Sequence, residues 1–206
     1  MDRTDKKNLV QAILLFAVFI FFTVLVCKVD VAAIGPQSSS VGFSKLNGAV
    51  AKLFPYNHLC YSISKYLGYF ALLICVFFAA MGVLEFISKK SLKKVDPKII
   101  SLGIFYLAVF MFYIMFMKVV VNYRPVLEDG ALESSYPSSH TMLAVCVFIS
   151  TIIQINSGKG SIAFKKAVKT IMILLTVVMI VTRTVSGVHW FTDIIGGIIL
   201  SVNQCT

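Results

Sequence analysis

The sequence has few charged residues and few cysteines, and each shortage excludes a class of protein. Only 14% of its 206 residues are charged and 58% are hydrophobic, whereas a soluble domain is ~25% charged and ~45–50% apolar. Five cysteines, two of which (Cys75 and Cys146) lie inside apolar runs, do not form a disulfide framework. A disordered or collagen-like chain is excluded by the same composition. The composition therefore predicts an integral membrane protein.

Acidic residues are also scarce, with 9 against 19 basic residues and a net charge of +10. In a soluble protein this excess would suggest nucleic-acid binding. Here the basic residues cluster between the apolar runs, where they act as topology signals. We therefore expect no nucleic-acid partner, and the sequence gives no indication of the oligomeric state.

Six apolar runs approach the ~20 residues that a helical membrane span needs. The first exceeds the ~7–15-residue core of a cleaved signal peptide, so we expect it to remain as span one. The last three are near the lower length limit, and the shortness of the last, close to Thr206, fits a truncated C-terminus. The predicted fold is an all-α integral membrane protein, a six-transmembrane-helix bundle with residues 1–206 as a single domain. Its spans are 9–26, 66–87, 99–121, 141–155, 167–181 and 188–202.

Lysine and arginine collect in three segments: the N-terminus, the loop after the second run and the loop after the fourth. These segments hold 12 of the 19 basic residues, and the positive-inside rule places them in the cytoplasm. The opposite loops hold four of the nine acidic residues. We expect a multi-pass protein of the cell membrane with cytoplasmic N- and C-termini.

Residues 31–65 form one long loop on the outer side. Its apolar residues at positions 46, 49, 50, 53 and 54 recur at helical spacing, with Lys45, Asn47 and Lys52 between them. This pattern predicts an interfacial amphipathic helix that ends at Pro55. An irregular loop is the alternative.

Six ionisable side chains lie in or beside the apolar runs, where they are energetically costly. For any one of them, snorkelling at a span end would be a sufficient explanation. Span parity, however, places all six at the outer face, and this convergence favours a functional site there. The six are Lys118, Arg124, His140, Arg183, His189 and Asp193.

Three cations and two histidines beside a helix start predict a phosphate-binding site. Residues 136–141 (YPSSHT) suit a helix N-terminus, whose backbone N–H groups bind phosphate oxygens. His189 and Asp193 are four residues apart, so on a helix the carboxylate would orient the imidazole as a nucleophile. His140 would protonate the departing oxygen.

We expect neither a metal nor another cofactor. Metal-dependent phosphate chemistry needs clustered carboxylates or histidines. Near the site only Asp193 is embedded, whereas Glu128, Asp129 and Glu133 lie in a loop that is typical of a solvated acidic surface. A weak divalent-cation site in that loop is the less favoured alternative.

These residues resemble the signature of the type 2 phosphatidic acid phosphatases, membrane members of a superfamily that includes acid phosphatases and vanadium haloperoxidases. The signature has three parts: Lys-x6-Arg-Pro, Pro-Ser-Gly-His and Ser-Arg-x5-His-x3-Asp. The corresponding segments here are Lys118–Pro125, Pro137–His140 and Thr182–Asp193. They cover about the second half of the chain in the family order.

The resemblance implies that His189 attacks phosphorus to form a phosphohistidine, oriented by Asp193, and that His140 is the general acid. It also implies that the phosphate oxygens are held by Arg124 and Arg183. The remaining phosphate-binding residues that it implies are Lys118, Ser138 and Ser139.

Three positions depart from the family pattern. Lys118 and Arg124 are six residues apart instead of seven, which on an ideal helix turns Lys118 about 100° away from the shared face. Ser139 replaces the family glycine, and Thr182 replaces its serine.

The resemblance implies a lipid phosphate phosphatase whose partners are the bilayer and a membrane lipid phosphate. Undecaprenyl pyrophosphate is the favoured substrate, followed by phosphatidic acid or phosphatidylglycerophosphate. A lipid phosphotransferase that uses the same residues is one alternative. A non-catalytic lipid-phosphate binder or transporter is another, for which Gly196 and Gly197 in the last run are the one weak indication.

Overall fold

A computed structural model describes residues 3–127 and 130–204, and within these ranges the chain is helical. Two short 3₁₀ turns, Pro36–Ser38 and Leu92–Lys94, accompany the α-helices. Two isolated bridges are the only β pairings among the described residues, so the all-α prediction is confirmed. The helices are α1 (Arg3–Lys28), α2 (Ser44–Leu53), α3 (His58–Lys89), α4 (Pro97–Lys118), α5 (Ser139–Ser157), α6 (Ile162–Val185) and α7 (Phe191–Gln204).

Five of the described helices, α1, α3, α4, α5 and α6, are long and apolar enough to cross a membrane. The sixth predicted span corresponds to α7, which has 14 residues. At 1.5 Å per residue it measures about 21 Å, less than the ~30 Å thickness of a bilayer's hydrocarbon core. The structure therefore supports five of the six predicted spans by length, and α7 is a shorter apolar helix.

The helix ends differ from the predicted spans by two to eight residues, and two of these differences bear on the site. α3 begins at His58, eight residues before position 66, because the side chain of Asn57 caps it by accepting a hydrogen bond from the Cys60 N–H at 3.0 Å. Its first turns are polar enough to be missed by hydropathy. α4 ends at Lys118, three residues before position 121, and Val119 is already extended (φ −94°, ψ 93°).

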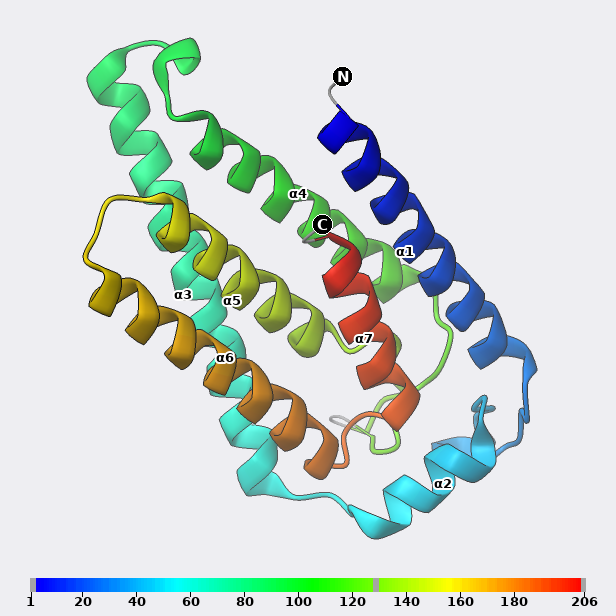
Figure 1. Ribbon diagram of the computed structural model, residues 1–206. Coiled ribbons are helices and arrows are strands. Elements are labelled where there is room, and N and C mark those ends of the chain that lie inside the picture. Colours follow the sequence, from blue (N-terminus) through cyan, green and yellow to red (C-terminus); the bar gives the residue numbers. More distant parts are fainter. Residues whose placement is uncertain (1–2, 128–129, 205–206) are drawn as a thin grey trace.

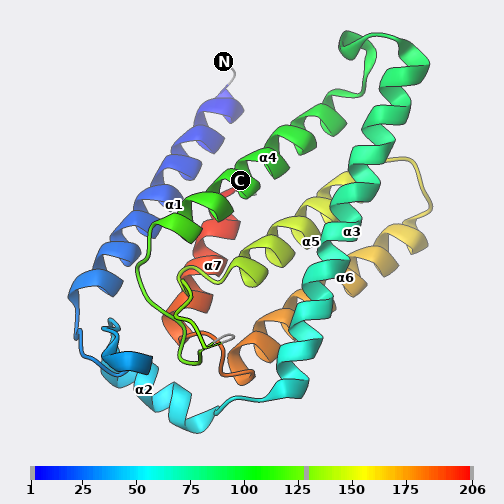
Figure 2. The same cartoon turned by 180° about the vertical axis from the view of Figure 1, so that it is seen from behind.

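The long helices run alternately up and down the bundle (Figure 1). α5 is the central helix: it packs against α3, α4, α6 and α7, and its middle turns are buried. Figure 2 shows α3 crossing over α5 and α6 on the opposite side of the bundle. The ends of α1, α4 and α6 and the starts of α3, α5 and α7 meet at one end of the molecule, which we call the site end.

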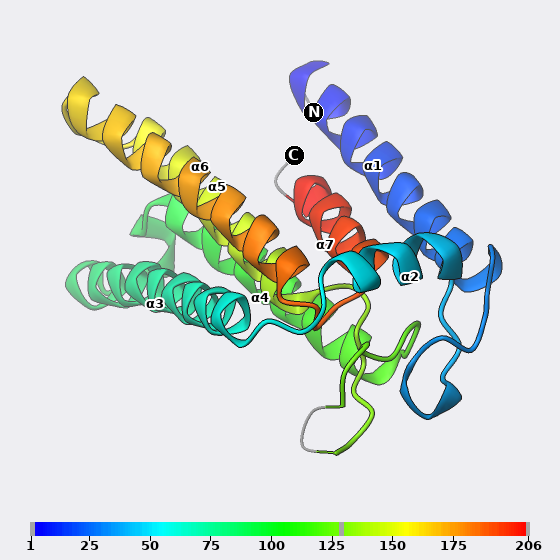
Figure 3. The same cartoon turned by 90° about the horizontal axis from the view of Figure 1, so that it is seen from below.

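α2 lies across the site end, against α7 (Figure 3). It forms where the amphipathic pattern predicts a helix, so the irregular-loop alternative is wrong for these residues. Asn47, however, points into the protein: it is fully buried and its Nδ2 donates to the Thr192 hydroxyl at 2.9 Å. Leu53 on the opposite side is 70% exposed. The contact fixes the first turn of α7, while the position of α2 at a membrane interface stays a prediction.

Candidate active site

Five of the six predicted ionisable residues meet at the site end. They come from the segment after α4 (Arg124), the start of α5 (His140), the end of α6 (Arg183), the loop after it (His189) and the first turn of α7 (Asp193). The end of α6, the loop after it and the first turn of α7 are consecutive in the sequence, whereas Arg124 and His140 come from earlier segments. The alternation of the helices brings them together.

Arg183 is the centre of the cluster. It is fully buried, and one guanidinium nitrogen lies 2.9 Å from His189 Nε2 and 3.4 Å from His140 Nδ1. The other terminal nitrogen donates to the Ser64 hydroxyl of α3 at 3.3 Å, and the Tyr61 ring lies 5.7 Å away. Arg183 thus holds both histidines and α3 around one cation.

The contact of Arg183 with His189 determines which ring nitrogen of His189 carries the proton. A guanidinium is a donor only, so His189 Nε2 must accept from it, and in the neutral imidazole the proton lies on Nδ1. The contact with His140 Nδ1 is longer, at 3.4 Å, and does not fix the protonation state of this histidine. His189 therefore keeps a lone pair on the nitrogen that faces the arginine.

The four-residue spacing predicted that His189 and Asp193 share a helix, but His189 lies outside α7. It lies in the loop between α6 and α7, which turns at Gly187 with φ +67°, a conformation that favours glycine. The predicted direct pairing is also loose, because His189 Nδ1 and Asp193 Oδ2 are 3.8 Å apart. The pair is nevertheless close enough for a third group to connect it.

Ser135 connects the pair. Its hydroxyl lies 2.9 Å from His189 Nδ1 and donates to Asp193 Oδ2. Since Nδ1 carries the proton, the serine oxygen accepts a hydrogen bond from His189, and the serine O–H donates a hydrogen bond to the carboxylate. The resulting chain runs from imidazole to hydroxyl to carboxylate, and all three residues are buried.

Asp193 receives two further hydrogen bonds. The backbone N–H of Trp190 donates to Oδ2 at 2.9 Å, and Asn122 Nδ2 donates to Oδ1 at 3.1 Å. Its backbone carbonyl accepts from the Ser138 N–H at 2.9 Å, which ties α7 to the start of α5. The carboxylate is thereby fixed in position and kept as an acceptor.

Burial and the guanidinium groups of Arg183 and Arg124 lower the pKa of His189 well below its ordinary value. Both causes act against the charged imidazolium. The imidazole is therefore neutral at neutral pH, which is the form that a nucleophile needs.

Arg124 lies in an irregular segment that folds back on itself through a bridge between Tyr123 and Ser134. Its guanidinium is 3.3 Å from Glu133, whose carboxylate is half-exposed. The Trp190 indole N–H holds the segment against the site by donating to the Tyr123 carbonyl at 2.7 Å. Glu133 was expected to be a plain surface acid, and it is instead an ion-pair partner of Arg124.

The other predicted phosphate-binding residues differ in position. Ser139 is the first residue of α5 and lines the cavities on both sides of the site. Ser138 is fully buried, and its hydroxyl accepts a hydrogen bond from Thr141 at 3.0 Å. Lys118 is exposed at the end of α4, where Met117 lines the adjoining cavity. The structure does not bring Lys118 into the cluster.

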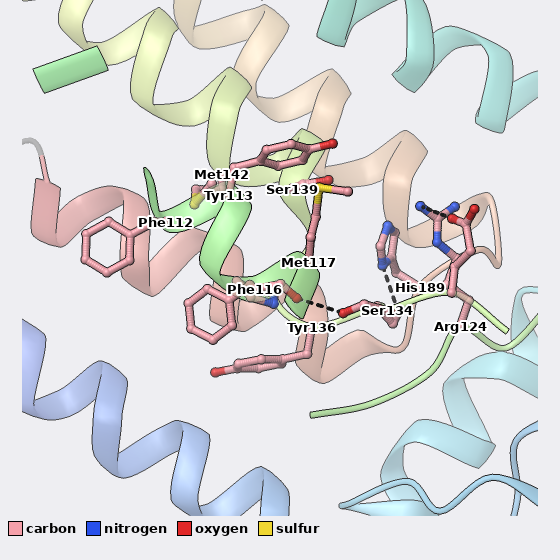
Figure 4. Close-up of a pocket in the computed structure, with 13 residues that line it drawn as sticks. Phe112, Tyr113, Phe116, Met117, Arg124, Ser134, Tyr136, Ser139, Met142 and His189 are labelled. Atoms are coloured by element: carbon pink, nitrogen blue, oxygen red, sulfur yellow. Dashed lines mark hydrogen bonds and ion pairs between the residues drawn. The ribbon is translucent and has the colours of Figure 1, made fainter. Parts of the chain in front are cut away.

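Two cavities adjoin the cluster. One, of about 270 Å³, lies between α4 and the segment before α5, with His189 and Arg124 at its polar end and Phe112 and Phe116 at the other (Figure 4). The second, of about 550 Å³, runs between α3, α4 and α5. Arg124 and Ser139 line both, so an anion bound at the arginines has access to each.

Ser135, Asn122 and Lys65 were missed in the sequence. Ser135 and Asn122 lie in the irregular segment between α4 and α5, where no periodicity indicates which side chains face the site. Lys65, which lines the larger cavity, falls just before the second apolar run and resembles an ordinary flanking lysine.

Within residues 3–127 and 130–204, no three side chains of histidine, cysteine, aspartate or glutamate lie close enough to hold a metal ion. Glu128 and Asp129, which the less favoured divalent-cation site would require, lie outside the described residues.

Comparison with known proteins identifies the family. The family model of the PAP2 superfamily matches residues 67–203, about two thirds of the chain. The chain belongs to the PAP2 superfamily. The resemblance noted in the sequence motifs is therefore confirmed, and the match includes every residue of the five-member cluster.

Two solved structures resemble this PAP2 chain. The first is a transmembrane PAP2-type phosphatidylglycerolphosphate phosphatase from Bacillus subtilis, at 19% identity and a TM-score of 0.54, covering 94% of this chain and 90% of that one. The second is LpxE from Aquifex aeolicus, at 20% identity and a TM-score of 0.42, covering 78% and 90%. No curated protein matches the chain. The first likeness shows a shared fold, and together with the five apolar helices it identifies a multi-pass membrane protein.

Proposed function

We propose that this PAP2 chain is a metal-independent lipid phosphate phosphatase that works through a phosphohistidine. The observation that carries the proposal is the protonation pattern of His189. Its Nε2 lone pair faces Arg183 at 2.9 Å, while Nδ1 is oriented by Ser135 and Asp193. A neutral, oriented imidazole beside a buried guanidinium is equipped to attack a phosphate.

In the first step, the phosphate oxygens replace His189 Nε2 as acceptors of the Arg183 N–H. His189 Nε2 then forms a bond to phosphorus, and the bond from phosphorus to the lipid oxygen breaks. The departing oxygen takes the electron pair and a proton from His140, which enters this step as the imidazolium and leaves it as a neutral imidazole. Arg183 and Arg124 stabilise the charge on the equatorial oxygens, with Ser139 at the helix start beside them. Asp193 stabilises the positive charge that develops on the imidazole, acting through Ser135.

In the second step, water attacks the phosphohistidine. His140, now deprotonated, takes a proton from that water, the nitrogen–phosphorus bond breaks and inorganic phosphate leaves. The protein groups in both steps are the five cluster residues together with Ser135 and Ser139. Lys118 has no part in this scheme, because it lies outside the cluster.

The larger cavity supports a lipid substrate. Past its polar end it is lined mainly by apolar side chains of α3, α4 and α5, such as Leu72, Phe110 and Leu143. This surface suits a hydrocarbon tail that enters from the bilayer. We place undecaprenyl pyrophosphate first among the substrates and phosphatidic acid or phosphatidylglycerophosphate next, with the site on the outer face.

The test is phosphate release by the purified protein from undecaprenyl pyrophosphate and from phosphatidic acid, with EDTA present. We expect release from at least one lipid, with no loss in EDTA, and no turnover by His189→Ala. The variant should elute from gel filtration like the wild type, because a loop residue is truncated. Full activity of His189→Ala would refute the nucleophile assignment, and loss of activity in EDTA would refute metal independence.

A further inference from the structure

Lys65 is a cation that has no role in the proposed catalytic steps. It lines the larger cavity, in which we place the hydrocarbon tail of the substrate. It is the eighth residue of α3 and lines this cavity together with Arg124, Ser139 and His140. Its neighbours one turn away, Tyr61 and Tyr69, line the same cavity, as expected for residues four apart on a helix.

Lys65 lies close to the catalytic cluster. The Tyr61 ring has the Lys65 ammonium 5.9 Å from its centre and the Arg183 guanidinium 5.7 Å from it. One aromatic ring therefore contacts the buried arginine that holds His189 and also the lysine on the tail side. Lys65 is exposed and also lines the cavity that His140 lines, so its ammonium can be reached both from water and from that cavity.

The charge around Lys65 suits an anion. The cavity holds two basic residues, Lys65 and Arg124, and none of its described lining residues is acidic. Much of the remaining cavity lining is apolar, as at Leu72 and Val109.

The polar contacts of α3 gather beside Lys65. The Ser64 hydroxyl accepts a hydrogen bond from Arg183, and Gly68, one turn after Lys65, lies against His140. Lys65 therefore lies within one helical turn of the α3 residues that contact Arg183 and His140.

We propose that Lys65 binds the second phosphate of a lipid diphosphate, the one that stays attached to the tail. The proposal rests on the proposed function and specifies its substrate class. A diphosphate carries an anion at this position, whereas a lipid monophosphate has a neutral carbon chain or ester group there. Lys65 therefore makes the site selective for diphosphates.

The contribution of Lys65 follows from where the charge goes in the first step. His189 attacks the terminal phosphorus, and the bond from that phosphorus to the bridging oxygen breaks. The bridging oxygen keeps the electron pair and leaves as part of the lipid monophosphate, with a proton from His140. The ammonium of Lys65 stabilises the negative charge of this leaving group, in the ground state and more strongly as the bond breaks.

The experiment compares two substrates with one tail, farnesyl diphosphate and farnesyl monophosphate, in detergent micelles. For Lys65→Met we expect kcat/KM for the diphosphate to fall at least ten-fold and that for the monophosphate to change less than two-fold. Lys65→Arg should keep most of the diphosphate activity because it keeps the charge. Lys52→Met, which removes an exposed lysine of α2 at the same end of the molecule, should change neither rate.

Three outcomes would overturn the assignment: equal losses on both substrates, no loss on either, or a wild-type enzyme that hydrolyses only the monophosphate. Each leaves the phosphatase proposal intact, because that proposal requires only His189-dependent release from some lipid phosphate. Conversely, a wild-type protein that releases phosphate from neither farnesyl substrate nor from phosphatidic acid would refute both. Equal melting temperatures of wild type and Lys65→Met in detergent would exclude misfolding as the cause of a loss.

Discussion

Ser135 is the residue on which the orientation of His189, the proposed nucleophile, most depends. Without its hydroxyl, His189 Nδ1 and Asp193 Oδ2 would face each other across 3.8 Å, too far for a hydrogen bond. Hydrogen bonds to charged groups contribute about 1.5–3 kcal/mol. Each 1.36 kcal/mol changes a rate ten-fold, so the serine contributes roughly a factor of 10–100.

Ser135→Ala should therefore lower kcat about 10–100-fold and leave KM within about two-fold, because the serine orients the imidazole and does not face the lipid. Steady-state kinetics on one lipid phosphate provide the measurement. Ser150→Ala is the matched control: Ser150 is also buried, but it bonds to Tyr106 and the Val147 carbonyl, away from the site. A rise in KM at unchanged kcat would contradict the positioning role.

Residue identities near the motifs were predictable, but their local geometry was not. The motifs gave Arg124, His140, Arg183, His189 and Asp193, which do meet. The ideal-helix argument about Lys118 does not apply, because α4 ends at that residue and the chain from Val119 to Arg124 is not helical. Ser135 and Asn122 act from the same irregular segment, where each side chain's direction depends on tertiary hydrogen bonds.

At the scale of elements, α3 passes unusually close to the start of α5. A Cβ atom placed on Gly68 would lie 2.7 Å from Cδ2 of His140, well inside van der Waals contact. The glycine therefore provides the space in which the imidazole lies beside Arg183. A side chain here would push the imidazole of His140, the proposed general acid, since α3 is packed against α5 and α6.

Gly68→Ala should consequently reduce kcat at least ten-fold while the protein stays folded, because a histidine ring can turn away more easily than a helix can move. Gly103→Ala in α4 is the control, since nothing lies within 4 Å of the added Cβ and alanine favours a helix over glycine by roughly 0.5–1 kcal/mol. Activity and melting temperature in detergent are measured for both variants. Equal activity of the two would show that His140 needs no such space.

The elements themselves were largely predictable, because long apolar runs must become helices in a bilayer. The exceptions are instructive. α3 extends back through Lys65, Ser64 and Tyr61. Their polar groups contact Arg183 or line the larger cavity, and they interrupt the hydropathy signal. Gly196, only a weak indication of a broken transporter helix, lies where a Cβ would be 2.6 Å from the Tyr136 ring. It is a packing contact of an unbroken α7, as a glycine in a helix contact would be.

At the scale of the whole molecule, the lysine-rich segments and the candidate active site lie at opposite ends. The site end carries α2 and the cluster, whereas the N-terminus and the loops after α3 and α5 lie at the other end (Figure 1). The lysine-rich segments are those same loops. If the positive-inside rule decides the orientation, the cluster acts on lipids of the outer leaflet.

Single cysteines test this orientation directly. In a variant whose five native cysteines are replaced by alanine, a cysteine at Lys45 of α2 should react in intact cells with a membrane-impermeant thiol reagent. A cysteine at Lys159, in the loop between α5 and α6, should react only after permeabilisation. Both positions are exposed, so a difference in their labelling would show on which side of the membrane each lies and would not result from burial. The reverse pattern would place the site on the cytoplasmic face, and the substrate ranking, which assumes an outer-face site, would no longer hold.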